Sequence, residues 1–177
     1  MQYPAHDAFI APARERPEIW RIVVGFLIIA LVYGLTIAVV MAAVFAFGGI
    51  SDPQAMINDI ALGATPFGTL VLLATFLGMA LGPMAAVLAL HSRGIGTLFG
   101  PLGRTMRHFL IALVICGALF SLSFLIPSDL QPEPNLDRAI WLSFLPLALI
   151  GVLVQTGAEE VLFRGYLQQQ LAARFRS

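Results

Sequence analysis

Four long apolar stretches without charged side chains alternate with short polar segments along the chain. They cover residues 22–47, 60–90, 109–126 and 139–158. A helix needs about 20 apolar residues to cross the roughly 30 Å hydrocarbon core of a bilayer. Because lipid offers no hydrogen-bond partner to the backbone, a continuous apolar span is expected to be helical. The pattern therefore predicts an all-α, polytopic transmembrane helix bundle with about four spans, near 20–47, 63–90, 109–126 and 139–158.

Small and capping residues add local detail to these spans. Gly78 and Gly82 form a small-xxx-small pair, which predicts close packing of the second span against another helix. Asn135 and Asp137 are both candidates for the N-cap of the fourth span. The glycine-rich segment 94–103 lacks the Gly-Lys-Ser/Thr of a phosphate-binding loop, so we expect a flexible connector.

The arginines are sorted along the chain. The segments with most arginine are those before the first span, after the second and after the fourth: Arg14, Arg16 and Arg21, then Arg93, Arg104 and Arg107, then Arg164, Arg174 and Arg176. Residues 48–59 and 127–138 instead carry acidic side chains and only Arg138. Since loops rich in Arg or Lys stay in the cytoplasm, we predict a cytoplasmic N-terminus and tail. The use of Arg without Lys suggests a bacterial genome rich in GC, and hence an inner (plasma) membrane.

Composition supports a membrane protein and excludes several other classes. The 177 residues are 59% hydrophobic and 11% charged, whereas a soluble domain carries about 25% charge. The ten basic residues balance ten acidic ones, so no basic excess is present to bind nucleic acid. Cys116 is the single cysteine, which excludes an internal disulfide. We expect a poorly ordered cytoplasmic arm over 1–18 and one transmembrane domain over 19–177, in contact with membrane lipid; the oligomeric state is not predicted.

Candidate chemistry gathers directly after the fourth span. Glu159, Glu160 and Arg164 are ionisable residues at the edge of the apolar layer, where such residues are the first functional candidates. On a helix over 159–174, Glu160 and Arg164 lie four apart on one face. Glu159 is rotated from Glu160 by about 100°. The spacing therefore predicts that Arg164 keeps Glu160 ionised while Glu159 faces a cavity and acts as a base.

A structural interpretation of the same segment stays open on spacing alone. Phe163, Leu167 and Leu171 form an apolar stripe, and Glu160, Arg164 and Gln168 form a polar one. This pattern is also typical of an amphipathic helix on the membrane surface with an ordinary ion pair.

The extended motif favours the functional interpretation over the structural one. Glu159-Glu160-x-x-Phe163-Arg164-Gly165-Tyr166-Leu167, continuing to Leu171, resembles the first signature of the CPBP intramembrane proteases. That family includes the CAAX prenyl endopeptidases, bacteriocin-processing proteins and Abi proteins. The match covers residues 159–171, and the remainder of the chain is compatible in hydropathy alone.

The resemblance implies an intramembrane endopeptidase that hydrolyses peptide or lipidated protein substrates. It implies that Glu159 activates water, that Glu160 is its partner and that Arg164 orients the pair. The complete family site is compatible with a divalent metal such as zinc. No cofactor is identifiable in this chain, because a glutamate pair alone is a poor metal site.

The chain departs from the family pattern in its histidines. The family's second and third signatures carry histidine and follow the first one, but His6, His91 and His108 all precede Glu159. We therefore expect the N-terminal part of a longer enzyme, truncated at its C-terminus and inactive by itself, with His91 and His108 beside lipid head groups. The alternative is a membrane protein without enzymatic activity, such as an immunity factor, scaffold or transporter subunit.

Overall fold

The chain is described by a computed structural model covering residues 4–125 and 135–175. The described residues form helices and no strands, which confirms the all-α class. In chain order the elements are α1 (Pro4–Ile10), the 3₁₀ helix η1 (Ala11–Glu15), α2 (Ile19–Phe47), α3 (Pro53–Leu62), α4 (Pro66–His91), the 3₁₀ helix η2 (Ile95–Leu98), α5 (Leu102–Ser123), α6 (Arg138–Glu160), the π-helix η3 (Val161–Gln168) and α7 (Gln169–Phe175).

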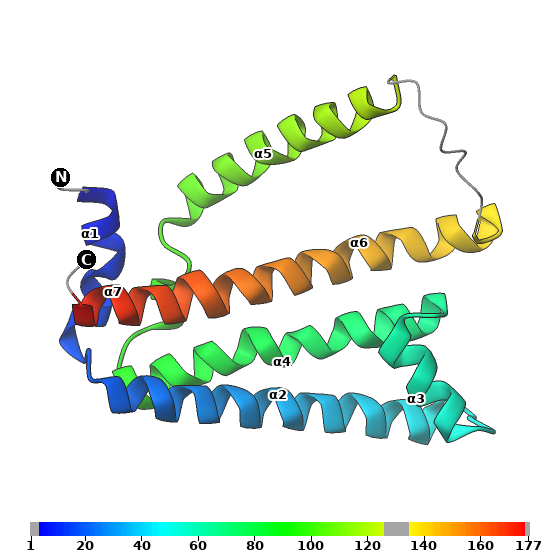
Figure 1. Ribbon diagram of the computed structural model, residues 1–177, viewed down its shortest axis with the longest axis horizontal. Helices are drawn as coiled ribbons and strands as arrows, with labels where there is room; N and C mark the ends of the chain where they lie inside the picture. The colour runs from blue at the N-terminus through cyan, green and yellow to red at the C-terminus, as the bar shows by residue number, and fades with distance from the viewer. Residues whose placement is uncertain (1–3, 126–134, 176–177) are drawn as a thin grey trace.

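Four helical segments are long and apolar enough to cross a membrane, as the hydropathy pattern predicted. They are Ile19–Phe47, Pro66–His91, Ile95–Ser123 and Arg138–Phe175. The fourth continues from α6 through η3 to α7, so the motif helix expected over 159–174 is part of this span (Figure 1). Asp137 is its N-cap and accepts a hydrogen bond of 2.8 Å from the amide of Ala139. The predicted end of the third span at residue 126 lies outside the described residues.

The core of the bundle is the antiparallel pair α2 and α4, with α6 on the other side of α4 (Figure 1). The glycine prediction for α4 is confirmed. A Cβ added at Gly78 would lie 2.6 Å from the Cβ of Thr36, and one added at Gly82 would lie 2.9 Å from the Cα of Ile29. Both glycines therefore let α4 approach α2 more closely than any larger residue would allow.

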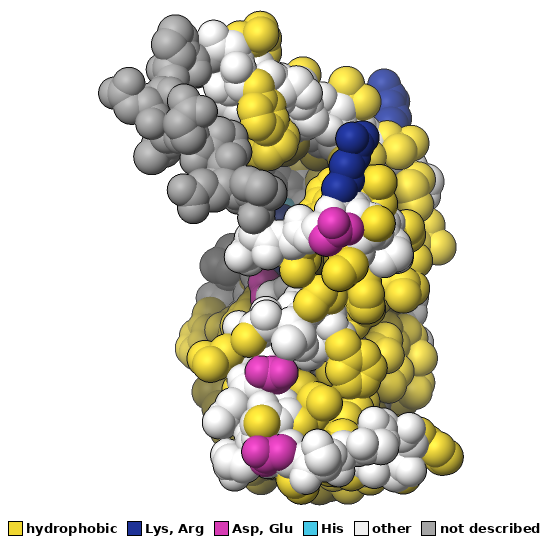
Figure 2. All heavy atoms as spheres, turned by 90° about the vertical axis from the view of Figure 1, so that its right-hand side faces the viewer, with side chains coloured by type: hydrophobic (Ala, Val, Ile, Leu, Met, Phe, Trp, Pro, Cys, Tyr) yellow, Lys and Arg dark blue, Asp and Glu magenta, His cyan; other side chains and the backbone are white. Residues whose placement is uncertain are grey.

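A short helix, α3, joins α2 to α4 and was not expected from hydropathy. Asp52 caps it by accepting hydrogen bonds from the amides of Gln54 and Ala55. Gly63 ends it in the left-handed conformation, with φ of 59°. The apolar stretch 60–90 therefore contains the end of α3 and all of α4 except its last residue, because the chain turns at Gly63. Figure 2 looks onto this end of the molecule, where acidic side chains are visible and hydrophobic ones cover the flank.

The described part of the N-terminal arm, from residue 4 onward, is helical over 4–15, whereas the sequence predicted poor order. α1 and η1 pack against α7, and Ile10 and Ala13 are buried there. The two prolines and the lack of periodicity gave no sign of this order in the sequence. The arm is ordered by a partner, α7, that lies at the other end of the sequence. The turn after α4 is also more ordered than the flexible connector that we expected: η2 packs on η3, and Leu98 is buried.

α5 is the exception to this packing. Every residue of α5 is exposed, and the helix diverges from α6 in space (Figure 1). Its apolar side chains therefore contribute nothing to the core formed by the described residues.

Candidate functional site

The candidate residues lie where the fourth span changes its helical winding. Glu159 and Glu160 end α6, and the π-helix η3 follows at once and contains Arg164. A π-helical turn is rare and occurs frequently at functional sites. The motif therefore begins in the last turn of α6 and continues into a locally distorted segment.

Two further residues of the motif are explained by packing. A Cβ added at Gly165 would lie 2.6 Å from the carbonyl oxygen of Leu98, so glycine is needed for η3 to contact η2. Tyr166 is completely buried, and its ring lies against Gly25 of α2. These two residues fix the position of η3 at the end of the α2–α4 pair.

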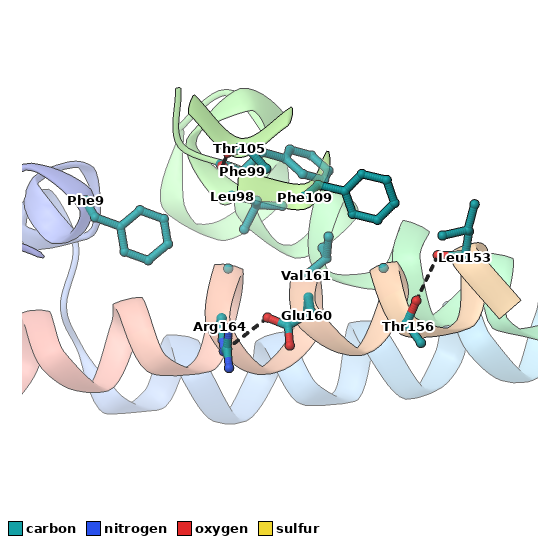
Figure 3. A pocket seen from close by; sticks show the side chains of 12 residues that line it. Phe9, Leu98, Phe99, Thr105, Phe109, Leu153, Thr156, Glu160, Val161 and Arg164 are labelled. Atoms are coloured by element: carbon teal, nitrogen blue, oxygen red, sulfur yellow. Dashed lines mark hydrogen bonds and ion pairs between the residues drawn. The ribbon is translucent and has the colours of Figure 1, made fainter. Parts of the chain in front are cut away.

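Glu160 and Arg164 form the ion pair that their spacing predicts. The Arg164 Nε lies 3.1 Å from the Glu160 Oε2 (Figure 3). The two side chains are 57% and 72% exposed, and an exposed pair of this kind contributes only about 0–1 kcal/mol to stability. The pair therefore orients two charged groups more than it stabilises the fold.

This ion pair lies on the wall of a pocket of about 430 Å³. The wall brings together α1, the η2 region, the first turns of α5 and the α6–η3 junction (Figure 3). Its lining residues are Phe9, Leu98, Phe99, Thr105, Phe109, Leu153, Thr156, Gly157, Glu160, Val161, Arg164 and Gly165. A largely apolar pocket with a few polar groups suits an apolar or amphipathic ligand.

Glu159 has a different environment from Glu160. It is partly buried, it is absent from the pocket lining, and it forms no ion pair among residues 4–125 and 135–175. Its neighbours Ala158 and Leu162 are buried, and Leu162 belongs to the cluster that contains Ala86 and Val87 of α4. The structure therefore joins Glu160 to Arg164 and places Glu159 on another side of the helix. The prediction that Glu159 is the carboxylate facing a cavity is wrong for this pocket, because its wall carries Glu160 instead.

None of the histidines forms an ion pair with a glutamate among the described residues. His108 is exposed on α5, His6 is half-buried on α1, and none of the three histidines lines the pocket. Within the described part of the chain, no group of three His, Cys, Asp or Glu residues could hold a metal ion. These residues therefore do not by themselves fit the zinc of the family site.

His91 is buried and does not face lipid, which corrects the prediction made for it. Only 2% of its surface is exposed. Its Nδ1 lies 3.3 Å from the carbonyl oxygen of Arg16, and its Nε2 lies 3.2 Å from the Tyr166 hydroxyl. The chain entering α2 covers it, an arrangement that a linear sequence does not reveal.

A buried polar cluster surrounds this histidine and was missed by the sequence reasoning. We use this name for His91, Arg93, Tyr166, Gln169 and Gln170, all of them buried. The Arg93 Nη1 donates to the Gln169 Oε1, and the Gln169 Nε2 donates to the carbonyl of Thr97 at 2.8 Å. No sequence signal links these residues, because the two halves of the cluster are more than 70 positions apart.

Arg93 keeps its positive charge although its side chain is buried. Removal from water lowers the pKa of Arg93 to about 10, so the guanidinium is still protonated at neutral pH. Burying a charged side chain is costly unless it is paired and hydrogen-bonded.

Comparison with known proteins identifies no relative: no protein-family model, no curated protein and no solved structure matches the chain.

Proposed function

We propose that this chain supplies the glutamate part of an intramembrane endopeptidase centre of the CPBP type. One observation carries the proposal: the Glu159-Glu160-x-x-x-Arg164 motif spans the junction between α6 and the π-helix η3 of a membrane-length helical segment, and its Glu160 and Arg164 line a largely apolar pocket. A regular amphipathic surface helix requires neither the distortion nor the pocket. The resemblance of the motif to the family signature adds the reaction class.

The environments of the two carboxylates support separate roles. Glu159 is partly buried, and none of the described residues forms an ion pair with it. In the proposed reaction it accepts a proton from a water molecule on its own side of the helix, next to the pocket wall that Glu160 lines, as that water attacks a peptide carbonyl. Glu160, held by Arg164, presents a fixed pair of charges on the pocket wall that can orient a peptide backbone. The chain contributes no histidine to the pocket, so we expect no turnover from these 177 residues alone.

The same proposal includes an orientation and a location. Eight arginines lie at the end of the bundle where α2 begins and α4 ends: Arg14, Arg16, Arg21, Arg93, Arg104, Arg107, Arg164 and Arg174. We call this the arginine-rich end. We propose that the protein lies in a bacterial inner membrane with this end on the cytoplasmic side. The motif and its pocket then open toward the cytosol, where a peptide or lipidated protein tail can enter.

The test uses the full product of the gene, because these 177 residues alone are expected to be inactive. That protein is purified into lipid nanodiscs and offered membrane peptides from its own cells. Glu159→Gln should lower the cleavage rate by about 10²–10⁴-fold, since it removes the base but keeps the shape. Glu160→Gln should lower it less, and Glu18→Gln, an exposed glutamate at the same end, should leave it unchanged.

Two results would contradict the proposal. One is undiminished cleavage by the Glu159→Gln protein. The other is the absence of any cleavage by the unaltered protein together with an unchanged cellular phenotype of Glu159→Gln, as a scaffold, immunity factor or transporter subunit predicts.

A further inference from the structure

The pocket beside the motif is elongated along the fourth span. On that span its wall runs from Leu153 to Gly165, which corresponds to about 18 Å along a helix. Figure 3 shows Arg164 toward one end of the pocket, and Phe109 and Leu153 toward the other. The volume of about 430 Å³ is within the range of sites that hold a small molecule. One elongated ligand can therefore contact both ends.

The two ends of the pocket differ in chemistry. Of the lining residues, which all lie in the described part of the chain, Glu160 and Arg164 are the two that carry a charge. Thr105 and Thr156 also line the wall, but each hydroxyl donates to the carbonyl oxygen four residues earlier, at 3.2 and 2.9 Å. The pocket is therefore amphipathic, with its charged end at the start of η3 and an apolar end beside Leu153.

The apolar end of the pocket lies within the membrane-length helices. Phe109 and Leu153 belong to the segments Ile95–Ser123 and Arg138–Phe175, both apolar enough to cross a membrane. Beyond the pocket α5 diverges from α6, and every residue of α5 is exposed (Figure 1). A hydrocarbon chain can therefore reach this end from the lipid layer without displacing a helix packed there among the described residues. The charged end belongs to the arginine-rich end, at the depth of lipid head groups.

The charged end is electrically neutral, because it pairs a base with an acid. The contact joins the Arg164 Nε to the Glu160 Oε2, and more than half of each side chain is exposed, so their other polar atoms can contact a ligand. The guanidinium suits a phosphate, and the carboxylate suits an ammonium group. A head group with negative charge alone would lie beside Glu160, and such a like-charge contact is costly. The complementary ligand therefore carries a phosphate and an ammonium group together.

We propose that this pocket binds one phospholipid whose head group carries a phosphate and a primary ammonium, as in phosphatidylethanolamine. The phosphate contacts the Arg164 guanidinium, the ammonium contacts the Glu160 carboxylate, and an acyl chain lies along Phe109 and Leu153. The lipid thereby fills the space between the first turns of α5 and the α6–η3 junction, and a peptide that enters the pocket displaces it. Binding requires no cleavage, so this inference and the role proposed for Glu159 can fail independently.

The test measures lipid binding by the full product of the gene, purified in a maltoside detergent. Three probes with identical acyl chains are titrated. They are phosphatidylethanolamine, phosphatidylcholine, whose ammonium has no N–H group, and phosphatidylglycerol, which has no ammonium. Native mass spectrometry counts the bound molecules, gives the dissociation constant of each lipid and identifies whatever copurifies with the protein.

One variant tests the place of the lipid. Gly157 lines the pocket, and a Cβ added there would meet no neighbouring atom within 4 Å, so Gly157→Leu fills the pocket instead of colliding with a packed helix. Gly117→Leu on α5 is the matched control, because an added Cβ there also meets nothing within 4 Å and Gly117 is not part of the pocket lining. Glu160→Gln and Arg164→Gln test the head group.

The unaltered protein and Gly117→Leu should bind one phosphatidylethanolamine, at least about 10-fold more tightly than either other lipid. Gly157→Leu should weaken that binding by about 10-fold or more, since its side chain occupies the space of the acyl chain. Arg164→Gln should weaken binding of all three lipids by about 10-fold, as expected for loss of a charge-assisted hydrogen bond. Glu160→Gln should abolish the preference for phosphatidylethanolamine over phosphatidylcholine.

Four outcomes would overturn the proposal. They are no binding or equal binding of the three lipids by the unaltered protein, unchanged affinity in Gly157→Leu, unchanged preference in Glu160→Gln, and copurification of a peptide or a second copy of the chain that Gly157→Leu removes. If Gly157→Leu does not fold, Glu160→Gln and Arg164→Gln decide, and unchanged affinities and preference in both reject the site.

Discussion

α4 and α5 are both long, apolar helices, yet their environments are opposite. The most apolar part of α4 has a mean hydropathy of 2.1, and 44% of it is buried. The most apolar part of the segment Ile95–Ser123, which contains α5, has a mean hydropathy of 1.8, and none of it is buried. The difference lies in their small residues. Gly78 and Gly82 of α4 contact α2 so closely that a Cβ would collide, whereas a Cβ added at Gly117 of α5 would meet nothing within 4 Å.

This comparison separates two properties that hydropathy combines. Apolar length decides that a helix is compatible with lipid. In lipid, however, apolar surface alone gives helices no reason to associate, and close packing at small residues supplies that association. α4 has both properties, and α5 has only the first within the described structure.

The largest expected effect comes from filling a glycine contact of α4. Gly82→Leu should lower the free energy of unfolding by about 3 kcal/mol, because the new side chain meets the backbone of Ile29. Gly117→Leu in α5 is the matched control and should cost nothing. Unfolding in detergent, followed by circular dichroism, measures both; equal effects of the two substitutions would reject the contrast between the helices.

A smaller effect is expected where the motif contacts the α2–α4 pair. Gly25→Ala should cost about 2 kcal/mol, because the new Cβ collides with the Tyr166 hydroxyl and lies 2.8 Å from its Cζ. Tyr166→Phe should cost about 1 kcal/mol through lost hydrogen bonds to His91 and the Arg21 carbonyl.

The two substitutions at this contact should be coupled. Because Tyr166→Phe removes the atom nearest the added Cβ, Gly25→Ala should cost less in the Tyr166→Phe protein than in the unaltered one. Strictly additive costs in a double-mutant cycle would show that the tyrosine does not lie against Gly25.

The smallest perturbation is a spin label on Cys116, the one cysteine of the chain, which is exposed on α5. In nanodiscs the label should leave the unfolding temperature unchanged and collide more often with dissolved oxygen than with a water-soluble nickel chelate. The control places the label on α4 by combining Cys116→Ser with Ala86→Cys, because Ala86 is completely buried. There both collision rates should be low, and similar rates at the two positions would contradict the different environments of α4 and α5.

The candidate site was predicted in part. The spacing of Glu160 and Arg164 was sufficient to predict their ion pair, because residues four apart on a helix are neighbours whatever surrounds them. The π-helical winding of Val161–Gln168 and the pocket were not predicted, since both depend on how η3 packs against η2 and the α2–α4 pair. The roles of Glu159, Glu160 and Arg164 in catalysis stay predictions.

The sequence by itself determined the four apolar helices, the close approach at Gly78 and Gly82, and the ion pair of the motif. Each of these depends on hydropathy, residue size or spacing within one segment. Only the tertiary structure decided that the N-terminal arm folds onto α7, that α5 stands apart, and that His91 and Arg93 are buried with Tyr166, Gln169 and Gln170. Those outcomes depend on partners distant in the chain, and the burial of a polar side chain is set by the segments that cover it.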